Sequence, residues 1–200
     1  LTIPTSSVVL RRSVFPARKE EDLRGLIDVE LSGNESLLPF RNPVFDFVRI
    51  GESEKGTEVV IFASPAEVVS QYVQAARSAG LNPTAVDVAP LALLRVLKRC
   101  LKATGGTLPG SFMILNAESE MVEISIFSDG CPAFFRSIPV QVRAMVDEDA
   151  DYLETYGRFF SVELARVMNF YKYSVSEQPP AVEAIYLMGD AHFAGGIMPI

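Results

Sequence analysis

The strongest constraint on the fold is the segment ILNAESEMVEISIFSDGCPAFFRSIP, residues 114–139, in which apolar and polar side chains alternate around a turn signal. Ile124 and Ile126 point to one face of a predicted strand, and the residues beside them point to the other, which is the two-residue period of β-structure. Asp129-Gly130 is a dipeptide typical of a tight hairpin turn. The segment therefore predicts two or three strands, with residues 116–121 at the tip of the first loop.

The remaining chain predicts a small α+β unit before this hairpin and a long helix after it. Over residues 7–88 the order strand, helix, strand, strand, helix, strand suits a small sheet with helices packed on it. The run KATGGTLPG, residues 102–110, contains Gly and Pro but has no apolar period, so we expect a domain boundary near residue 105. The expected strands are 7–14, 43–50, 57–63, 82–88 and 182–187, and the expected helices are 19–31, 90–101, 147–173 and one opened by Ser64-Pro65 and closed by Gly80.

Composition and charge exclude several classes of function. The net charge of −7 argues against a nucleic-acid partner, because binding to phosphates needs a clustered basic surface. One histidine and two cysteines, Cys100 and Cys131, form no metal-ligand pattern, so we expect no metal site and no catalytic residue. No apolar, uncharged run reaches the roughly 18 residues of a membrane span, so we expect a soluble protein.

Four segments that follow one another in order point to a family. GLNPTAVDVAPLALLRVL, FSDGCPAFFRSIP, ELARVMNFYKYS and AIYLMGDAHF together resemble the PilM proteins of type IV pilus assembly, and the matches extend over residues 5–193. The resemblance implies an α/β chain, a partial FtsA/PilM-type actin-like fold. It also implies that relatives begin well before the equivalent of Leu1 and continue beyond Ile200, so neither end is expected to be a natural terminus.

The resemblance also implies a division of the chain. Residues 1–105 would hold the end of the first actin-like subdomain with an inserted small α+β subdomain of the FtsA (SHS2) type. Residues 106–200 would form an incomplete second actin-like subdomain, which is similar to ribonuclease H.

The first loop of the hairpin corresponds to the family's second phosphate motif, a strand that ends in Asp-x-Gly-x-x-x-Thr. The resemblance places Asn116 at the Asp, Glu118 at the Gly and Val122 at the Thr. A neutral Asn116 is a poorer partner for the water shell of Mg²⁺, and Val122 lacks the hydroxyl donor. The carboxylate of Glu118 would repel a nearby phosphate.

Two further positions of the nucleotide site follow from the same resemblance. Gly189-Asp190 stands where the adenosine motif normally has Gly-Gly, and Glu163 stands where actin-like relatives often place a residue near the nucleotide. Glu163 and Arg166 are also spaced as an exposed i,i+3 ion pair. We therefore expect a degenerate site that does not hydrolyse ATP and binds Mg-ATP weakly or not at all, so no cofactor is predicted.

The resemblance implies a binding function instead. PilM proteins lie on the cytoplasmic face of the inner membrane, bind the cytoplasmic N-terminal peptide of PilN and connect the platform to the cytoplasmic motor ATPases. Their peptide groove corresponds here to the surroundings of Ser6–Val14 and Ser64–Ala76. The leading hypothesis is thus a pilus-platform scaffold, and the alternatives are an active actin-like ATPase of the pilus machinery and an FtsA-like cell-division protein.

Overall fold

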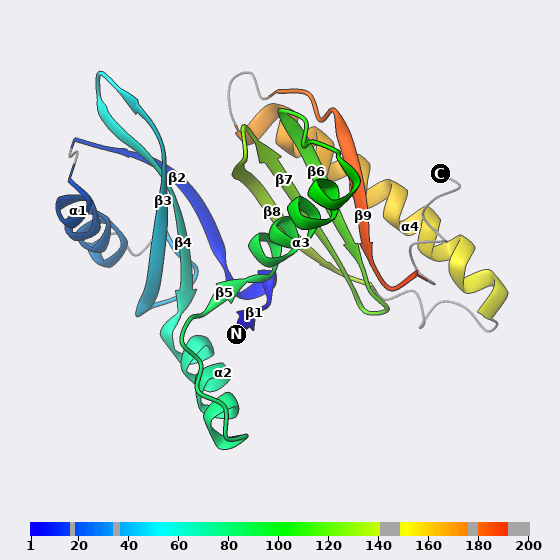
Figure 1. Cartoon of the computed structure of the whole chain (residues 1–200), viewed down its shortest axis with the longest axis horizontal. Coiled ribbons are helices and arrows are strands. Elements are labelled where there is room, and N and C mark those ends of the chain that lie inside the picture. Colours follow the sequence, from blue (N-terminus) through cyan, green and yellow to red (C-terminus); the bar gives the residue numbers. More distant parts are fainter. Residues whose placement is uncertain (17–18, 34–36, 141–148, 176–179, 192–200) are drawn as a thin grey trace. The chain divides into compact units, whose positions relative to one another are not determined.

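The computed structural model of the chain describes residues 1–16, 19–33, 37–140, 149–175 and 180–191 (Figure 1). The chain divides into two compact units, Leu1–Ala92 and Leu93–Ile200. The division falls within helix α3, Ala89–Thr104, whereas the predicted boundary near residue 105 lies just after this helix. The assignment of the two parts to actin-like subdomains remains a prediction.

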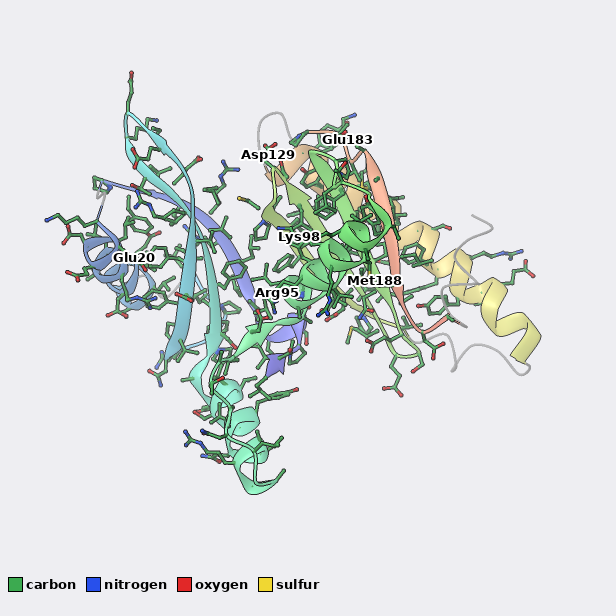
Figure 2. The ribbon with its side chains drawn as sticks, viewed as in Figure 1. Glu20, Arg95, Lys98, Asp129, Glu183 and Met188 are labelled. Carbon is green, nitrogen blue, oxygen red and sulfur yellow. The ribbon has the colours of Figure 1, made fainter. Side chains whose placement is uncertain are left out.

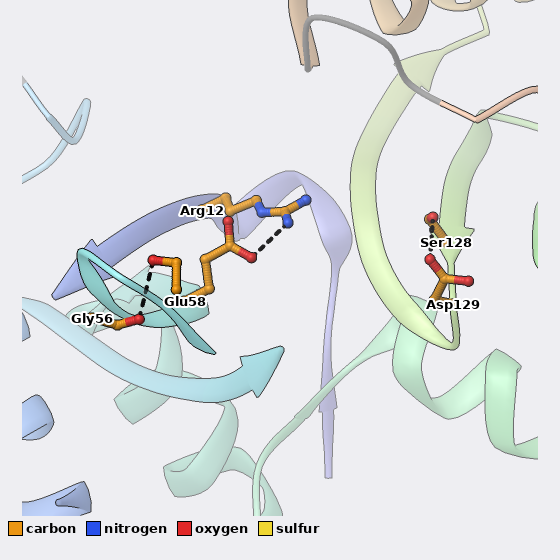
Figure 3. A network of polar contacts seen from close by, with 6 residues as sticks. Arg12, Gly56, Glu58, Ser128 and Asp129 are labelled. Carbon is orange, nitrogen blue, oxygen red and sulfur yellow. Dashed lines mark hydrogen bonds and ion pairs between the residues drawn. The ribbon is translucent and has the colours of Figure 1, made fainter. Parts of the chain in front are cut away.

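The first unit contains a three-stranded antiparallel sheet with one helix on one face. The strands are β2 (Val9–Phe15), β3 (Pro43–Ser53) and β4 (Gly56–Pro65), in the spatial order β2-β4-β3. Helix α1 (Glu20–Gly33) buries residues spaced four apart against alternate residues of the central strand, as amphipathic periods require. This core includes Leu23, Ile27, Leu31, Val59, Ile61 and Ala63. On β2 and β4, Arg12 and Glu58 form an ion pair of 2.9 Å (Figure 3).

A second, smaller group of elements completes this unit. Strands β1 (Thr2–Ile3) and β5 (Asp87–Val88) form a parallel pair, a 3-10 helix spans Thr5–Ser7, and helix α2 covers Ala66–Ser78. The predicted strand at 82–88 is wrong for its first five residues, because only the last two are extended in a ladder and Pro83 has no N–H to donate. The prediction of packed helices holds for α1, but α2 contains no fully buried residue.

The second unit contains a four-stranded sheet in the order β8-β7-β6-β9. Its strands are β6 (Ser111–Ala117), β7 (Met121–Ser128), β8 (Cys131–Pro139) and β9 (Ala184–Gly189), and only β9 pairs in parallel. The hairpin turn is confirmed, because Ser128 pairs with Cys131 and the two residues between them have φ of 51° and 75°. The hydroxyl of Ser128 donates to the carboxylate of Asp129 in this turn (Figure 3).

Both faces of the central strands β6 and β7 are buried. Helix α4 (Asp149–Phe170), which continues as a π-helix over Tyr171–Val175, lies behind the sheet in Figure 1, and α3 lies in front of it. The helix predicted at 147–173 is confirmed over its described part, and its first two residues lie outside the described residues. The side chains that pack between α4 and the sheet include Met113, Leu115, Ile124, Ile126, Tyr156, Phe160 and Val167. No helix of the described chain is long and apolar enough to cross a bilayer.

Candidate functional site

Five of the six predicted nucleotide-site residues meet at one end of the second sheet. The ends of β6 and β9 and the start of β7 lie together there, because Ala117 pairs with both Val122 and Gly189. The amide of Asp190 donates to the carbonyl of Ala117 at 2.9 Å. The fold thus brings Asn116, Glu118, Val122, Gly189 and Asp190 into one neighbourhood, and their role toward a nucleotide remains a prediction.

The side chain of Asn116 is already engaged within this neighbourhood. Its Nδ2 donates to Oε1 of Glu118 at 2.9 Å and to Oε2 of Glu123 at 3.4 Å. Asn116 and Glu123 are both buried and occupy facing positions of β6 and β7. One neutral amide therefore links two carboxylates, where a Mg-phosphate group would need a carboxylate facing the metal and donors facing the phosphate.

The tip of the loop is also poorly arranged for phosphate. The backbone N–H of Glu118 donates to the carbonyl of Met121 at 3.0 Å, so it is not directed at a ligand. The hydroxyl of Tyr156 donates to the carbonyl of Glu118 at 3.3 Å and holds the loop from the side of α4. Val122 is only 1% exposed and belongs to the apolar core. These contacts agree with the predicted degenerate site, and the loss of Mg-ATP binding stays a prediction.

Close contact with the backbone of β6 explains why residue 189 is a glycine. Its φ is +102°, and a Cβ built on it would lie 2.2 Å from the carbonyl oxygen of Ala117, far inside van der Waals contact. Only glycine allows β9 to approach β6 this closely at their last paired residues. The glycine is thus needed for strand pairing whether or not a nucleotide binds.

Glu163 lies apart from this group on α4. It follows Phe160 and precedes Val167 on the stripe that faces the sheet, and it is 9% exposed. Its carboxylate forms an ion pair with Arg166, whose side chain is 70% exposed. The alternative of an exposed ion pair is therefore half right, because the pair exists but its acidic member is buried.

A different feature appears in the first unit, where an apolar groove of about 220 Å³ lies beside β4 and α2. Its walls come from distant parts of the sequence and include Ile3, Val8, Phe62, Val69 and Val86. Val8 and Val69 belong to the two segments, Ser6–Val14 and Ser64–Ala76, near which the family resemblance predicts a peptide groove. Sequence patterns alone missed the contributions of Ile3, which pairs with Val88 of β5, and of Val86, which precedes β5.

Three polar residues line the same groove. Ser64 is 5% exposed, and its hydroxyl has no hydrogen-bond partner within the described chain. A buried hydroxyl normally has a partner, so its position on the wall provides a donor and acceptor for a bound chain. Asp46 and Asp87 also line it, but Asp46 forms an ion pair of 2.6 Å with Arg24, and the carboxylate of Asp87 accepts a hydrogen bond from the amide of Val88. The arrangement suits an apolar peptide segment that offers a polar backbone group to Ser64.

The described residues contain no cluster of three His, Cys, Asp or Glu side chains that could hold a metal ion. Burial raises the pKa of Tyr171 above its ordinary value, and the neighbouring Ser111 side chain offsets part of this rise. Tyr171 packs in the core beneath the sheet and belongs to neither candidate site.

Comparisons with known proteins support the fold. No protein-family model and no curated protein matches the sequence. A chain of the PilM–PilN type IV pilus biogenesis complex matches with a TM-score of 0.69 and 24% identity over 96% of this chain. This chain spans 62% of the length of that relative. The predicted PilM-type α/β fold is therefore confirmed, as a likeness of fold.

Two further solved structures are more distant. The cytoplasmic domain of EpsL, an inner membrane component of the type II secretion system of Vibrio cholerae, matches with a TM-score of 0.45 and 9% identity over 74% of this chain and 53% of that one. A Bacteroides thetaiotaomicron protein with an actin-like ATPase fold and unknown function matches with a TM-score of 0.37 and 12% identity over 100% of this chain and 72% of that one.

Proposed function

We propose that this protein is a scaffold of a type IV pilus assembly platform and that the groove of its first unit binds the cytoplasmic N-terminal peptide of a PilN partner. The likeness to a chain of the PilM–PilN complex supports this proposal. The observation that carries it is the apolar groove with the unpartnered Ser64 hydroxyl, which lies beside the segments where the family resemblance predicts a peptide.

The groove sets the chemistry of the bound segment. Apolar side chains of the peptide would replace water against Ile3, Phe62 and Val69, and each buried CH₂ group contributes about 0.8 kcal/mol. The hydroxyl of Ser64 would pair with a backbone group of the peptide. Because Asp46 is already paired with Arg24, charge should contribute little, and the affinity should depend only weakly on salt.

The same proposal includes the loss of nucleotide chemistry. Its support is the Asn116 amide bound to two carboxylates, the engaged N–H of Glu118 and the buried Val122. We therefore propose a protein that acts by binding and does not turn over ATP. Its position would be cytoplasmic, peripheral at the inner face of the membrane through its partners, with the pilus motor ATPases as additional partners.

The experiment is titration calorimetry of the full chain with a synthetic peptide of the cytoplasmic N-terminal residues of PilN. Val69→Arg would place a long cation in the groove, and we expect at least about tenfold weaker binding. Ser64→Ala removes one hydrogen-bonding group, which corresponds to an affinity loss of about two- to tenfold.

Val68→Arg is the matched control. Val68 is the neighbouring valine of α2, is similarly half-buried and does not line the groove, so its replacement should leave the affinity unchanged. Circular dichroism of each variant checks that the fold is kept. No heat of binding with the wild-type chain, or equal losses in the two arginine variants, would contradict the proposed groove.

A further inference from the structure

The outer face of α3 carries a stripe of positive charge in an otherwise acidic chain. Helix α3 contains four Lys and Arg residues and no Asp or Glu, although the whole chain has a net charge of −7. All four are exposed, and Figure 2 shows Arg95 and Lys98 along this helix. The stripe consists of Arg95, Lys98, Arg99 and Lys102, which are spaced i, i+3, i+4 and i+7 and therefore share one face.

Most of this charge is uncompensated inside the chain. Arg95 has an interaction with another residue, but no side-chain hydrogen bond or ion pair joins Lys98, Arg99 or Lys102 to the described residues. Val96 lies beside the stripe and is 54% exposed. The large apolar side chains of the opposite face, Leu94 and Leu97, are buried in the chain itself.

Helix α1 of the first unit has the complementary outer face. We call Glu21, Asp22, Gly25, Asp28 and Val29 the acidic face, because they lie opposite the buried residues of this helix. Its three carboxylates have no hydrogen bond or ion pair with the described residues. Val29 adds an apolar side chain, 70% exposed, to this face.

Gly25 gives the acidic face the shape of a docking surface. A glycine inside an exposed helix costs about 1 kcal/mol of stability relative to alanine, and a Cβ at this position would meet nothing within 4 Å. A shallow hollow lies over it, with Glu21, Asp22 and Val29 among its lining residues, and Lys19 is the one cation among the described residues that line it. A small residue beside exposed apolar side chains allows a second helix to approach closely.

From these two surfaces we propose that copies of this chain associate through the acidic face of α1 in one copy and the basic stripe of α3 in another. The two faces match in length, because Glu21 and Asp28, like Arg95 and Lys102, lie seven positions apart, about 10 Å along a helix. Opposite charges face each other along this length, and Val29 and Val96 supply an apolar contact beside them. The contact joins two different surfaces, so it is heterologous.

An anionic membrane fits the stripe less well than a second copy does. Helices that lie in a membrane interface insert large apolar side chains beneath their cations, but Leu94 and Leu97 of α3 are buried in the chain. The net charge of −7 also opposes adsorption of the whole chain to an anionic surface. The acidic face, in contrast, carries charge of the opposite sign, spaced over the same helix length as the stripe, with an exposed valine beside it.

Charge reversal in sedimentation velocity experiments on the full chain tests the proposal. Lys98→Glu with Lys102→Glu should weaken self-association at least about tenfold, and Glu21→Lys with Asp28→Lys should do the same. An equimolar mixture of the two variants, or all four changes in one chain, should return the association to within about threefold of wild type. Raising salt from about 50 to about 300 mM should weaken it in every associating sample.

The control variant changes the net charge by the same amount as Lys98→Glu with Lys102→Glu, but at exposed positions elsewhere. Lys55→Glu with Arg158→Glu lies outside both surfaces and should associate like wild type. A wild-type chain that stays monomeric up to about 1 mM at low salt would overturn the proposal, as would equal losses in the control. Monomers that instead bind phosphatidylserine vesicles through Lys98 and Lys102 would also overturn it.

Discussion

Replacing Gly189 by alanine separates a structural reason for this glycine from a nucleotide-binding one. The new Cβ would lie 2.2 Å from the oxygen, 2.8 Å from the nitrogen and 2.9 Å from the carbon of the Ala117 backbone. These are main-chain atoms of β6, so they cannot turn aside as a flexible side chain would. The ends of β6 and β9 must therefore separate in Gly189→Ala.

The stability cost of Gly189→Ala is the sum of the backbone strain and the interactions lost when the two strand ends separate. Alanine at a φ of +102° carries backbone strain of about 1–3 kcal/mol. The hydrogen bond from the Asp190 amide to the Ala117 carbonyl, 2.9 Å long, contributes about 0.5–1.5 kcal/mol and would be lost. With the steric separation added, we expect the free energy of local opening to fall by about 3 kcal/mol or more. This corresponds to about a hundredfold increase in the population of the open state.

Hydrogen exchange of the β6 and β9 peptides, followed by mass spectrometry, measures this opening directly. Gly130→Ala is the matched control, because Gly130 also has a positive φ, +75°, but a Cβ there would meet nothing within 4 Å. It should cost only the backbone strain, about 1–2 kcal/mol, and should act on the β7–β8 turn. Equal exchange in Gly189→Ala and wild type would refute the close approach of the two strands.

Two further outcomes are expected. Calorimetry of the wild-type chain with Mg-ATP should give a Kd above about 1 mM, because Glu118 and Asp190 stand where phosphate and adenosine motifs carry glycine, and a micromolar Kd would contradict the degenerate site. The free energy of unfolding should fall as pH rises above 10.0, the ordinary pKa of tyrosine, because burial raises the pKa of Tyr171 and only the unfolded state then releases its proton. Tyr171→Phe should reduce this decline in alkaline urea titrations, whereas Tyr173→Phe, at a side chain 74% exposed, should leave it unchanged.

Local patterns predicted much of the second unit. The alternation around Ile124 and the Asp129-Gly130 dipeptide gave the hairpin with its turn, because strand period and turn conformation depend on neighbouring residues. The long helix followed in the same way from apolar spacing. The first unit was harder, since the strand predicted at 82–88 is extended in a ladder only at Asp87–Val88.

The candidate sites show where local patterns stop. The alignment with a phosphate motif located Asn116 and Glu118, but the amide shared between Glu118 and Glu123 depends on the pairing of β6 with β7. Gly189 looked like the remnant of an adenosine motif, and the structure supplies a different reason in its contact with Ala117. Neither relation is visible from residues close in sequence.

The sequence by itself determined the hairpin, the main helices, the charge and the likeness to PilM, because each depends on short-range periods or on the order of segments. Only the tertiary structure decided which residues line the groove, that the hydroxyl of Ser64 is buried there without a partner, and that Gly189 meets the backbone of β6. The physical reason is that these features arise where distant segments pack and pair, and burial and steric contact exist only after the chain has folded.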